Sequence, residues 1–328
     1  MRPDDALSPP TPVLERTVAA FADRYVCPSV PWGADPGPAR AWVAPLLTGT
    51  GRHEDVSEEW LALPGGGGGH RIRVRILRPV GVDGPLPVVL FLHGLGWMLT
   101  DATEHEHLLA DLALGAEAAV VVPEYDRAPE ARYPVATEQV YAVARWITDR
   151  GADRRLDGDR IAVVGASAGA NLAAALTLLA KERGGVRLVH QVLLCPVTDA
   201  AMDTDSYRDF AEGFFLGREA MRHFWDQYVP DPADRFRNTA SPLRATDAEL
   251  VGLPKALVVT AEADVLRDEG EGYAAKLRRA GVSVVSVRYH GTVHGFVLFD
   301  ALRSSDASRA ARTQTLDTLH EALHPWPM

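Results

Sequence analysis

Short apolar runs alternate with longer amphipathic segments along most of the chain. Continuous apolar runs at 86–93 and 118–123 predict strands that are buried on both faces of a sheet. Further strands are predicted at 160–165, 187–195, 255–261 and 282–289, and helices at 13–25, 105–114, 134–150, 168–183, 269–280 and 304–323. Strands and helices that alternate in this way specify a mostly parallel sheet with helices on both faces, so the predicted fold class is α/β.

One further strand is predicted at 71–78, where apolar residues and arginines alternate strictly. The apolar positions Ile72, Val74 and Ile76 face one side, and Arg71, Arg73 and Arg75 face the other. This pattern is typical of a half-exposed strand near a sheet edge, with the arginines on a solvated face. Five glycines at 65–69 precede it. Because no Lys-Ser/Thr pair follows and no helix begins there, a flexible turn is favoured over a phosphate cradle.

The segment 200–245 breaks the alternation, because it is rich in aromatic residues and ends in prolines. We interpret it as an insertion over the carboxyl edge of the sheet, where the sites of α/β proteins lie. Residues 1–55 are rich in proline and tryptophan and do not suit independent folding. The predicted organisation is therefore 1–55 as the N-terminal part of a cap, 56–199 as core, 200–245 as cap insertion and 246–328 as core.

Composition excludes several classes of function. The 328 residues carry a net charge of −10 and contain no block of basic residues, which argues against nucleic acid as a partner. The apolar runs are shorter than the roughly 18 residues that cross a bilayer, and the N-terminus lacks the apolar core of a signal peptide. The two cysteines, Cys27 and Cys195, form neither a disulfide framework nor a zinc spacing, which favours reduced thiols in a cytoplasmic protein. Cys195 is expected to be a small core residue.

The segment 160–181 reads as a strand, a tight turn and a helix, with Ser167 at the turn between Gly165 and Gly169. The flanking glycines suit a turn in which the strand and helix backbones nearly touch, and such a turn exposes the serine oxygen at the sheet edge. The same residues also suit a tightly packed turn without chemistry. A serine nucleophile needs a histidine to take its proton, a carboxylate to orient the histidine, and N–H donors for the oxyanion.

Candidates for these partners follow other strands. His294 lies just past the strand at 282–289, whereas His290 adjoins that strand and is expected to pack or to bind backbone. Asp264 lies a few residues beyond the strand at 255–261. Glu262 is a weaker candidate. Asp268 and Glu269 are expected to begin the next helix, where its dipole favours carboxylates. The order Ser, Asp, His is the one that such strand–turn–helix sites use.

Two upstream motifs complete the candidate chemistry. Glycines 94 and 96, in the segment 93–97, would let backbone amides approach a bound carbonyl group. The segment 104–107 reads Glu-His-Glu-His and invites a metal interpretation. Because helix neighbours two residues apart do not face each other, a solvated helix face is favoured and no metal site is predicted.

At these motifs the chain resembles the bacterial hormone-sensitive-lipase-like carboxylesterases of the α/β-hydrolase fold. The matching segments are 93–97, 125–130, 165–173, 213–216 with 225–228, 241–243, 264–270 and 294–296. The resemblance implies Ser167 as nucleophile, His294 as base and Asp264 as its orienter. It also implies oxyanion donors at Leu95, Gly96 and Ala168, and a helical cap. No metal or organic cofactor is implied. The family often forms homodimers, although nothing in this sequence shows one.

Three departures from the family pattern stand out. Leu95 replaces the middle glycine of the oxyanion loop, so its side chain could narrow the pocket although its N–H can still donate. Ala166 replaces the aspartate that usually precedes the nucleophile, which removes a supporting hydrogen bond. Residues 125–127 read Tyr-Asp-Arg instead of Tyr-Arg-Leu. None of these changes removes a reacting group.

The expected function is therefore hydrolysis of short- to medium-chain carboxylic esters, small-molecule substrates, through an acyl-enzyme. Trp97, Phe214 and Phe215 are candidate substrate contacts, although packing within the cap explains such aromatics equally well. A pathway-specific deacetylase, thioesterase or amidase on the same residues is an alternative. A non-hydrolytic relative that binds a small molecule is a further one, because fold alone does not fix function.

Overall fold

The structure is a computed structural model that describes residues 12–25, 33, 35–47, 53–64 and 71–325. The glycine run 65–69 and Cys27 lie outside the described residues. One eight-stranded sheet has the order β1-β2-β4-β3-β5-β6-β7-β8. Strand β2 is antiparallel to both β1 and β4, and the remaining neighbours are parallel. The strands are β1 (Val56–Pro64), β2 (Arg71–Pro79), β3 (Leu86–Leu92), β4 (Ala119–Glu124), β5 (Leu156–Ala166), β6 (Leu188–Leu194), β7 (Lys255–Ala263) and β8 (Val284–Val293).

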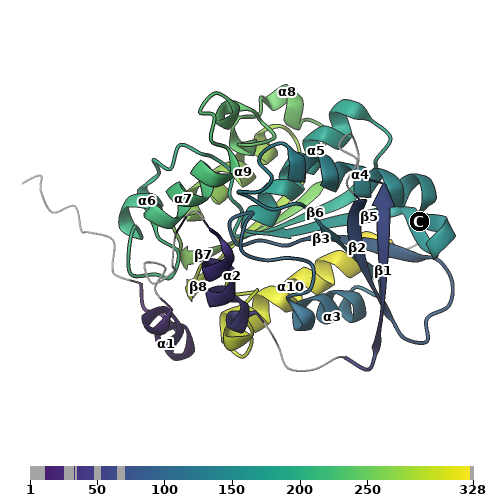
Figure 1. Cartoon of the computed structure of the whole chain (residues 1–328), viewed down its shortest axis with the longest axis horizontal. Coiled ribbons are helices and arrows are strands. Elements are labelled where there is room, and N and C mark those ends of the chain that lie inside the picture. Colours follow the sequence, from purple (N-terminus) through teal and green to yellow (C-terminus); the bar gives the residue numbers. More distant parts are fainter. Residues whose placement is uncertain (1–11, 26–32, 34, 48–52, 65–70, 326–328) are drawn as a thin grey trace, which may run out of the picture.

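Helices cover both faces of this sheet (Figure 1). Helices α3 (Glu106–Gly115) and α10 (Asp306–Leu323) lie along one face, and α4 (Val135–Arg150), α5 (Ala168–Arg183) and α9 (Arg267–Arg279) lie along the other. Every residue of β3 is buried, as its continuous apolar run predicts. The predicted α/β class, with a mostly parallel sheet between two helical layers, is confirmed.

Shorter elements gather at the end of the sheet where the parallel strands finish (Figure 1). They are α1 (Arg16–Arg24), α2 (Gly37–Val43), α6 (Asp205–Asp209) and α7 (Arg218–Tyr228). The short turns η2 (Ala44–Leu46), η3 (Gly151–Arg154), η4 (Asp234–Phe236), η5 (Pro242–Arg244) and η6 (Asp300–Leu302) and helix α8 (Asp247–Leu250) complete the described elements. Phe21 of α1 packs on Phe215, with ring centroids 5.2 Å apart, so the first helix contacts the segment 200–245.

Glu15, at the start of α1, joins this helix to the core. Its backbone N–H donates to the Gly291 carbonyl over 2.8 Å, and its carboxylate accepts hydrogen bonds from the amides of Asp306 and Ala307, both 2.8 Å long. Those amides belong to the first turn of α10, where a carboxylate is favoured by the helix dipole. One residue therefore binds both β8 and the start of α10.

The arginine face of β2 agrees with the prediction at Arg71 and Arg73, which are exposed, and differs from it at Arg75. Arg75 is only 2% exposed and is not solvated. Its guanidinium contacts Glu58 of β1 at 2.8 Å and Glu106 of α3 at 2.6 Å. Strand β1, which the sequence pattern did not predict, forms the sheet edge beyond β2, and together with α3 it covers this face. The buried cation is tolerated because two carboxylates pair with it.

The predicted solvated helix face at 104–107 is also wrong. His105 precedes α3 in the left-handed conformation (φ 64°), is 2% exposed and packs edge-on against Phe91. Burial lowers its pKa to about 4, so the ring is neutral near neutral pH. His107 forms a 2.8 Å hydrogen bond with His53. The segment 104–107 is not a solvated face because α3 packs directly on the sheet, which turns the start of the helix inward.

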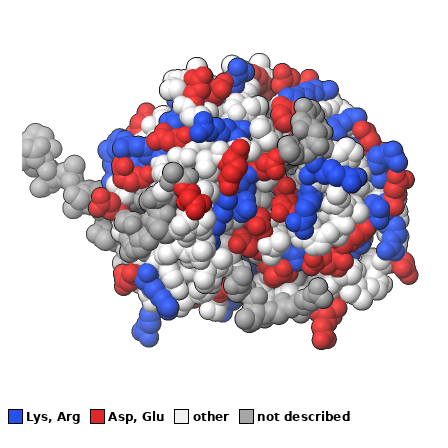
Figure 2. Space-filling view, in the orientation of Figure 1, with Lys and Arg blue, Asp and Glu red and all other residues white. Residues whose placement is uncertain are grey.

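Positive and negative side chains are interspersed on the face shown in Figure 2, without a large block of either sign. This agrees with the sequence, which lacks a basic cluster. Among the helices that the structure describes, none combines the length and the apolar character required to span a bilayer.

Candidate active site

Ser167 occupies the tight turn between β5 and α5, as predicted. Its backbone has φ 57° and ψ −120°, an unusual conformation for a residue other than glycine. A Cβ on Gly165 would lie 2.2 Å from the Gly169 carbonyl oxygen, and a Cβ on Gly169 would lie 1.9 Å from the Leu92 carbonyl oxygen. Both positions therefore require glycine, and the close approach of strand and helix is confirmed.

A continuous chain of hydrogen bonds joins Ser167 to His294 and Asp264. Nε2 of His294 lies 2.9 Å from Oγ of Ser167, and Nδ1 lies 2.8 Å from Oδ2 of Asp264. All three side chains are buried. An ionised carboxylate only accepts hydrogen bonds, so the ring proton belongs on Nδ1 and the lone pair of Nε2 faces the serine hydroxyl. The structure thus brings together the three residues that the sequence singled out.

The position of Asp264 is fixed by its own backbone neighbourhood. The residue follows β7, and its second oxygen, Oδ1, accepts a 2.9 Å hydrogen bond from the amide of Leu266. His294 follows β8, the neighbouring parallel strand. The carboxyl ends of β5, β7 and β8 lie at one edge of the sheet, which explains how residues far apart in sequence meet.

The rival residues lie elsewhere. His290 is an exposed residue of β8 whose Nδ1 pairs with Glu262 at 3.0 Å, so the expectation that it packs or binds backbone is wrong. Asp268 and Glu269 do lie in the first turn of α9, as predicted. Glu269 has a further role, because it is buried and accepts hydrogen bonds from the amides of Thr198, at 2.5 Å, and Asp199, at 3.3 Å. Burial raises the pKa of this carboxyl well above its usual value.

The loop after β3 places backbone amides near the serine. Leu95, Gly96 and Trp97 have φ values of 58°, 69° and 60°, three consecutive left-handed residues. A Cβ on Gly94 would lie 2.3 Å from the Ala166 carbonyl oxygen, which brings this loop against the serine turn. Within the described residues, no backbone carbonyl accepts a hydrogen bond from the amides of Leu95, Gly96 or Ala168. These amides are therefore available to a negatively charged oxygen.

A buried hydrogen-bond network holds this loop. Oγ1 of Thr100 donates to the Gly94 carbonyl over 2.9 Å and lies 3.1 Å from Nδ1 of His93. Because the threonine proton is used on Gly94, Nδ1–H of His93 is the donor to Oγ1. Burial lowers the pKa of His93 well below its usual value, so the ring is neutral. The Tyr125 ring stacks on His93 at 4.0 Å, and its hydroxyl donates to the His93 carbonyl over 2.8 Å.

The structure places the three candidate substrate contacts as follows. Trp97 is fully buried between Trp225 and Tyr228, with ring centroids 5.0 and 4.4 Å away, so its indole packs against α7. Phe215 is buried and contacts the Phe299 ring at 5.0 Å. Phe214 is partly buried and lies 5.2 Å from Phe210. The side chain of Leu95, which replaces a glycine, is buried as well.

Two residues near the site were not identified from the sequence. Thr100 carries no pattern that separates it from an ordinary loop residue. Cys195 was expected to be only a core residue, but its thiol lies within 4.8 Å of a carboxylate oxygen of Asp264 and a ring nitrogen of His294. Burial raises the pKa of this thiol well above its usual value. The sequence could have indicated this position, because Cys195 directly follows β6, which lies between the strands that precede Ser167 and Asp264.

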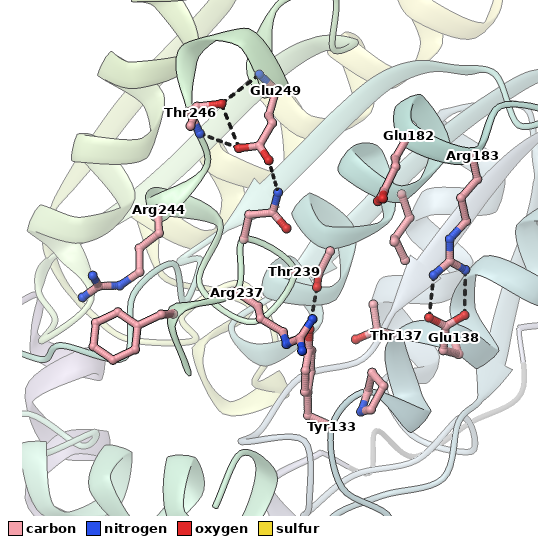
Figure 3. Close-up of a pocket in the computed structure, with 14 residues that line it drawn as sticks. Tyr133, Thr137, Glu138, Glu182, Arg183, Arg237, Thr239, Arg244, Thr246 and Glu249 are labelled. Carbon is pink, nitrogen blue, oxygen red and sulfur yellow. Dashed lines mark hydrogen bonds and ion pairs between the residues drawn. The ribbon is translucent and has the colours of Figure 1, made fainter. Parts of the chain in front are cut away.

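A polar recess of about 740 Å³ lies away from these residues, between α4, α5 and the segment 236–249 (Figure 3). Ser167, Asp264 and His294 are not among its lining residues. Two of its charged residues pair with each other, because Arg183 binds Glu138 through two 2.7 Å hydrogen bonds. We therefore assign the recess no part in the chemistry at Ser167.

The sheet order, the serine turn and the adjacent histidine and carboxylate together define an α/β hydrolase. A family model described as the α/β-hydrolase fold matches residues 89–298. The carboxylesterase NlhH of Mycobacterium tuberculosis is 39% identical over 255 residues, 77% of this chain and 79% of the relative. An ethyl acetate hydrolase of Pseudomonas putida is 34% identical over 235 residues, 70% of this chain and 72% of the relative.

Solved structures agree with these relatives. A thermostable esterase from Pseudomonas putida ECU1011 superposes with a TM-score of 0.90 at 40% identity, covering 96% of this chain and 99% of that one. The chain belongs to the hormone-sensitive-lipase-like carboxylesterase family of the α/β-hydrolase fold. It is a carboxylic ester hydrolase.

Proposed function

We propose that the chain hydrolyses esters through an acyl-enzyme formed on Ser167. The serine Oγ attacks the ester carbonyl while Nε2 of His294 takes the hydroxyl proton, and Asp264 stabilises the resulting imidazolium. The protonated ring then gives its proton to the departing alcohol. A water molecule, deprotonated by the same nitrogen, releases the acid. The observation that supports this proposal is the unbroken chain of 2.9 and 2.8 Å hydrogen bonds in a buried site.

The amides of Leu95, Gly96 and Ala168 are proposed to bind the oxyanion of the tetrahedral intermediate. The left-handed loop at 95–97 and the first residue of α5 supply these amides. Among the described residues, no backbone carbonyl accepts a hydrogen bond from them. Fixed donors of this kind stabilise charge that develops only in the transition state. Leu95 contributes through its backbone N–H, so its replacement of a glycine leaves the donor in place.

The proposed substrates are short- to medium-chain carboxylic esters. An ethyl acetate hydrolase among the relatives supports a small substrate. The aromatic residues of the segment 200–245 support an apolar acyl pocket, with Phe214 and Phe215 as its proposed contacts. The cap is proposed to comprise 1–55 and 200–245, and Trp97 to support it from below.

Hydrolysis of aryl esters graded from acetate to dodecanoate tests the proposal. Wild-type turnover should be highest on the shorter esters, and Ser167→Ala should lower it by a factor on the order of 10⁴–10⁶. A serine-directed phosphonate should label wild type at residue 167. Turnover of Ser167→Ala within tenfold of wild type, or labelling at another serine, would contradict the assignment.

A further inference from the structure

The C-terminal end of α10 brings two histidines to the turn that follows α3: His320 lies in the last turn of the helix, and His324 is its C-cap. His320 and His324 are four residues apart and therefore lie on one side of the helix. Their rings stack with centroids 4.7 Å apart. Glu117, from the turn between α3 and β4, faces them. One ring nitrogen of each histidine and one carboxylate oxygen of Glu117 all lie within 4.8 Å of one another.

A hydrogen bond shows which ring nitrogen of His324 carries a proton. Nε2 of His324 lies 3.0 Å from the carbonyl oxygen of Ala116. A carbonyl only accepts, so Nε2 carries a proton, and in the neutral ring the lone pair is then on Nδ1. Histidines that bind metal ions usually donate their second ring N–H to a carbonyl or carboxylate in this way. The C-terminal end of a helix also favours a positive charge.

We propose that Glu117, His320 and His324 bind a divalent transition-metal ion such as Zn²⁺. Two imidazole nitrogens and one carboxylate oxygen suit zinc, whereas calcium and magnesium prefer oxygen ligands throughout. Zinc bonds of about 2.0–2.1 Å would bring the ligand atoms to roughly 3.4 Å from one another. Because Glu117 is exposed and both histidines are half-buried, small side-chain rotations can close that distance. Water completes the coordination.

This site is separate from the serine site. It lies at the C-terminal end of α10, a helix of 18 residues that spans about 27 Å, whereas the other end of the helix follows the segment that carries His294. A bound ion would join the end of α10 to the turn after α3, two elements that run along the same face of the sheet (Figure 1). The expected effect is therefore on stability and not on turnover.

Isothermal titration of the full chain with zinc chloride tests the proposal. Wild type should bind one ion, and Glu117→Gln and the double variant His320→Ala/His324→Ala should bind at least about tenfold more weakly. The matched control is His290→Ala, which removes an exposed histidine that pairs with Glu262 outside this cluster. It should bind zinc as wild type does. Calcium chloride should give no heat of binding.

Thermal unfolding and turnover give independent readings. Zinc should raise the Tm of wild type and of His290→Ala but not that of the double variant, and it should leave ester turnover unchanged. Cys195, Asp264 and His294 form the other group of metal-ligating atoms among the described residues. Zinc bound there would stop turnover and would persist in the double variant. The proposal would be overturned by zinc bound at that second group, by equal zinc affinity in wild type and double variant, or by no zinc binding to wild type.

Discussion

Thr100→Val is expected to loosen the loop that carries the proposed oxyanion donors. The substitution keeps the shape of the side chain but removes the hydroxyl that links His93 to the Gly94 carbonyl. It leaves one buried N–H and one buried carbonyl without this partner. Each buried polar group left unsatisfied costs about 1–3 kcal/mol, so the free energy of unfolding should fall by about 2–6 kcal/mol.

The same change should lower kcat more than it alters KM. Removing one oxyanion donor outright typically costs about 10²–10³ in kcat, and a displaced loop should cost less, on the order of tenfold. The assays are steady-state hydrolysis of a short aryl ester and urea unfolding, both at neutral pH. KM reports ground-state binding, which does not depend on these amides, so a loss confined to KM would point to a different role for the loop.

Thr315→Val is the matched control. Thr315 is buried in α10, and its hydroxyl has no hydrogen-bond partner among the described residues. Removing an unsatisfied buried hydroxyl should be neutral or stabilising and should not change turnover. If Thr100→Val and Thr315→Val behave alike in both assays, the network at His93 does not hold the loop and the reasoning is refuted.

Three further predictions follow from the structure. Asp264→Asn should lower kcat by a factor on the order of 10⁴ with the fold retained by circular dichroism, because the amide no longer holds the required tautomer of His294; unchanged kcat would exclude Asp264 as the orienting carboxylate. The pKa of His105 is about 4 in the folded protein against an ordinary 6.5, so the unfolded chain binds more protons between these values and stability falls as pH falls. Between pH 7 and pH 5, the free energy of unfolding of His105→Asn, measured in urea, should therefore fall by about 2 kcal/mol less than that of wild type. An identical fall in both proteins would contradict burial of a neutral ring. Gly96→Ala puts a Cβ 2.2 Å from the Phe224 ring and should lower kcat at least about tenfold. The control is Gly81→Ala, where φ is 80° and no atom lies near the added Cβ, so only stability should change. Equal turnover in the two variants would count against a steric effect at the loop.

The central strands and the candidate site could be predicted because local pattern and topology determine them. The continuous apolar runs that predicted β3 and β4 mark strands buried on both faces, and the glycines around Ser167 are required by contacts shorter than a Cβ allows. Asp264 and His294 were recognisable because each follows a parallel strand, and parallel strands end at one edge. The cytoplasmic location and the homodimer stay predictions.

The errors concern residues whose surroundings come from distant segments. Arg75 is buried because β1 and α3 cover it, and no alternation within β2 reveals that cover. His105 is buried because the start of α3 turns onto Phe91, which depends on how the helix packs and not on its sequence. His290 finds Glu262 on the neighbouring strand β7. Partners of this kind depend on the tertiary arrangement, which a single sequence pattern does not contain.

The two attachments of Glu15 enclose the stretch in which His294 lies, since Gly291 precedes that histidine and Asp306 follows it. The N-terminal helix thus holds both ends of the loop that carries His294, the proposed general base. Trimming the chain past this glutamate would free both ends of the loop at once. A variant shortened at the N-terminus beyond Glu15 would then lose the alignment of the His294 imidazole before its hydrophobic core unfolded.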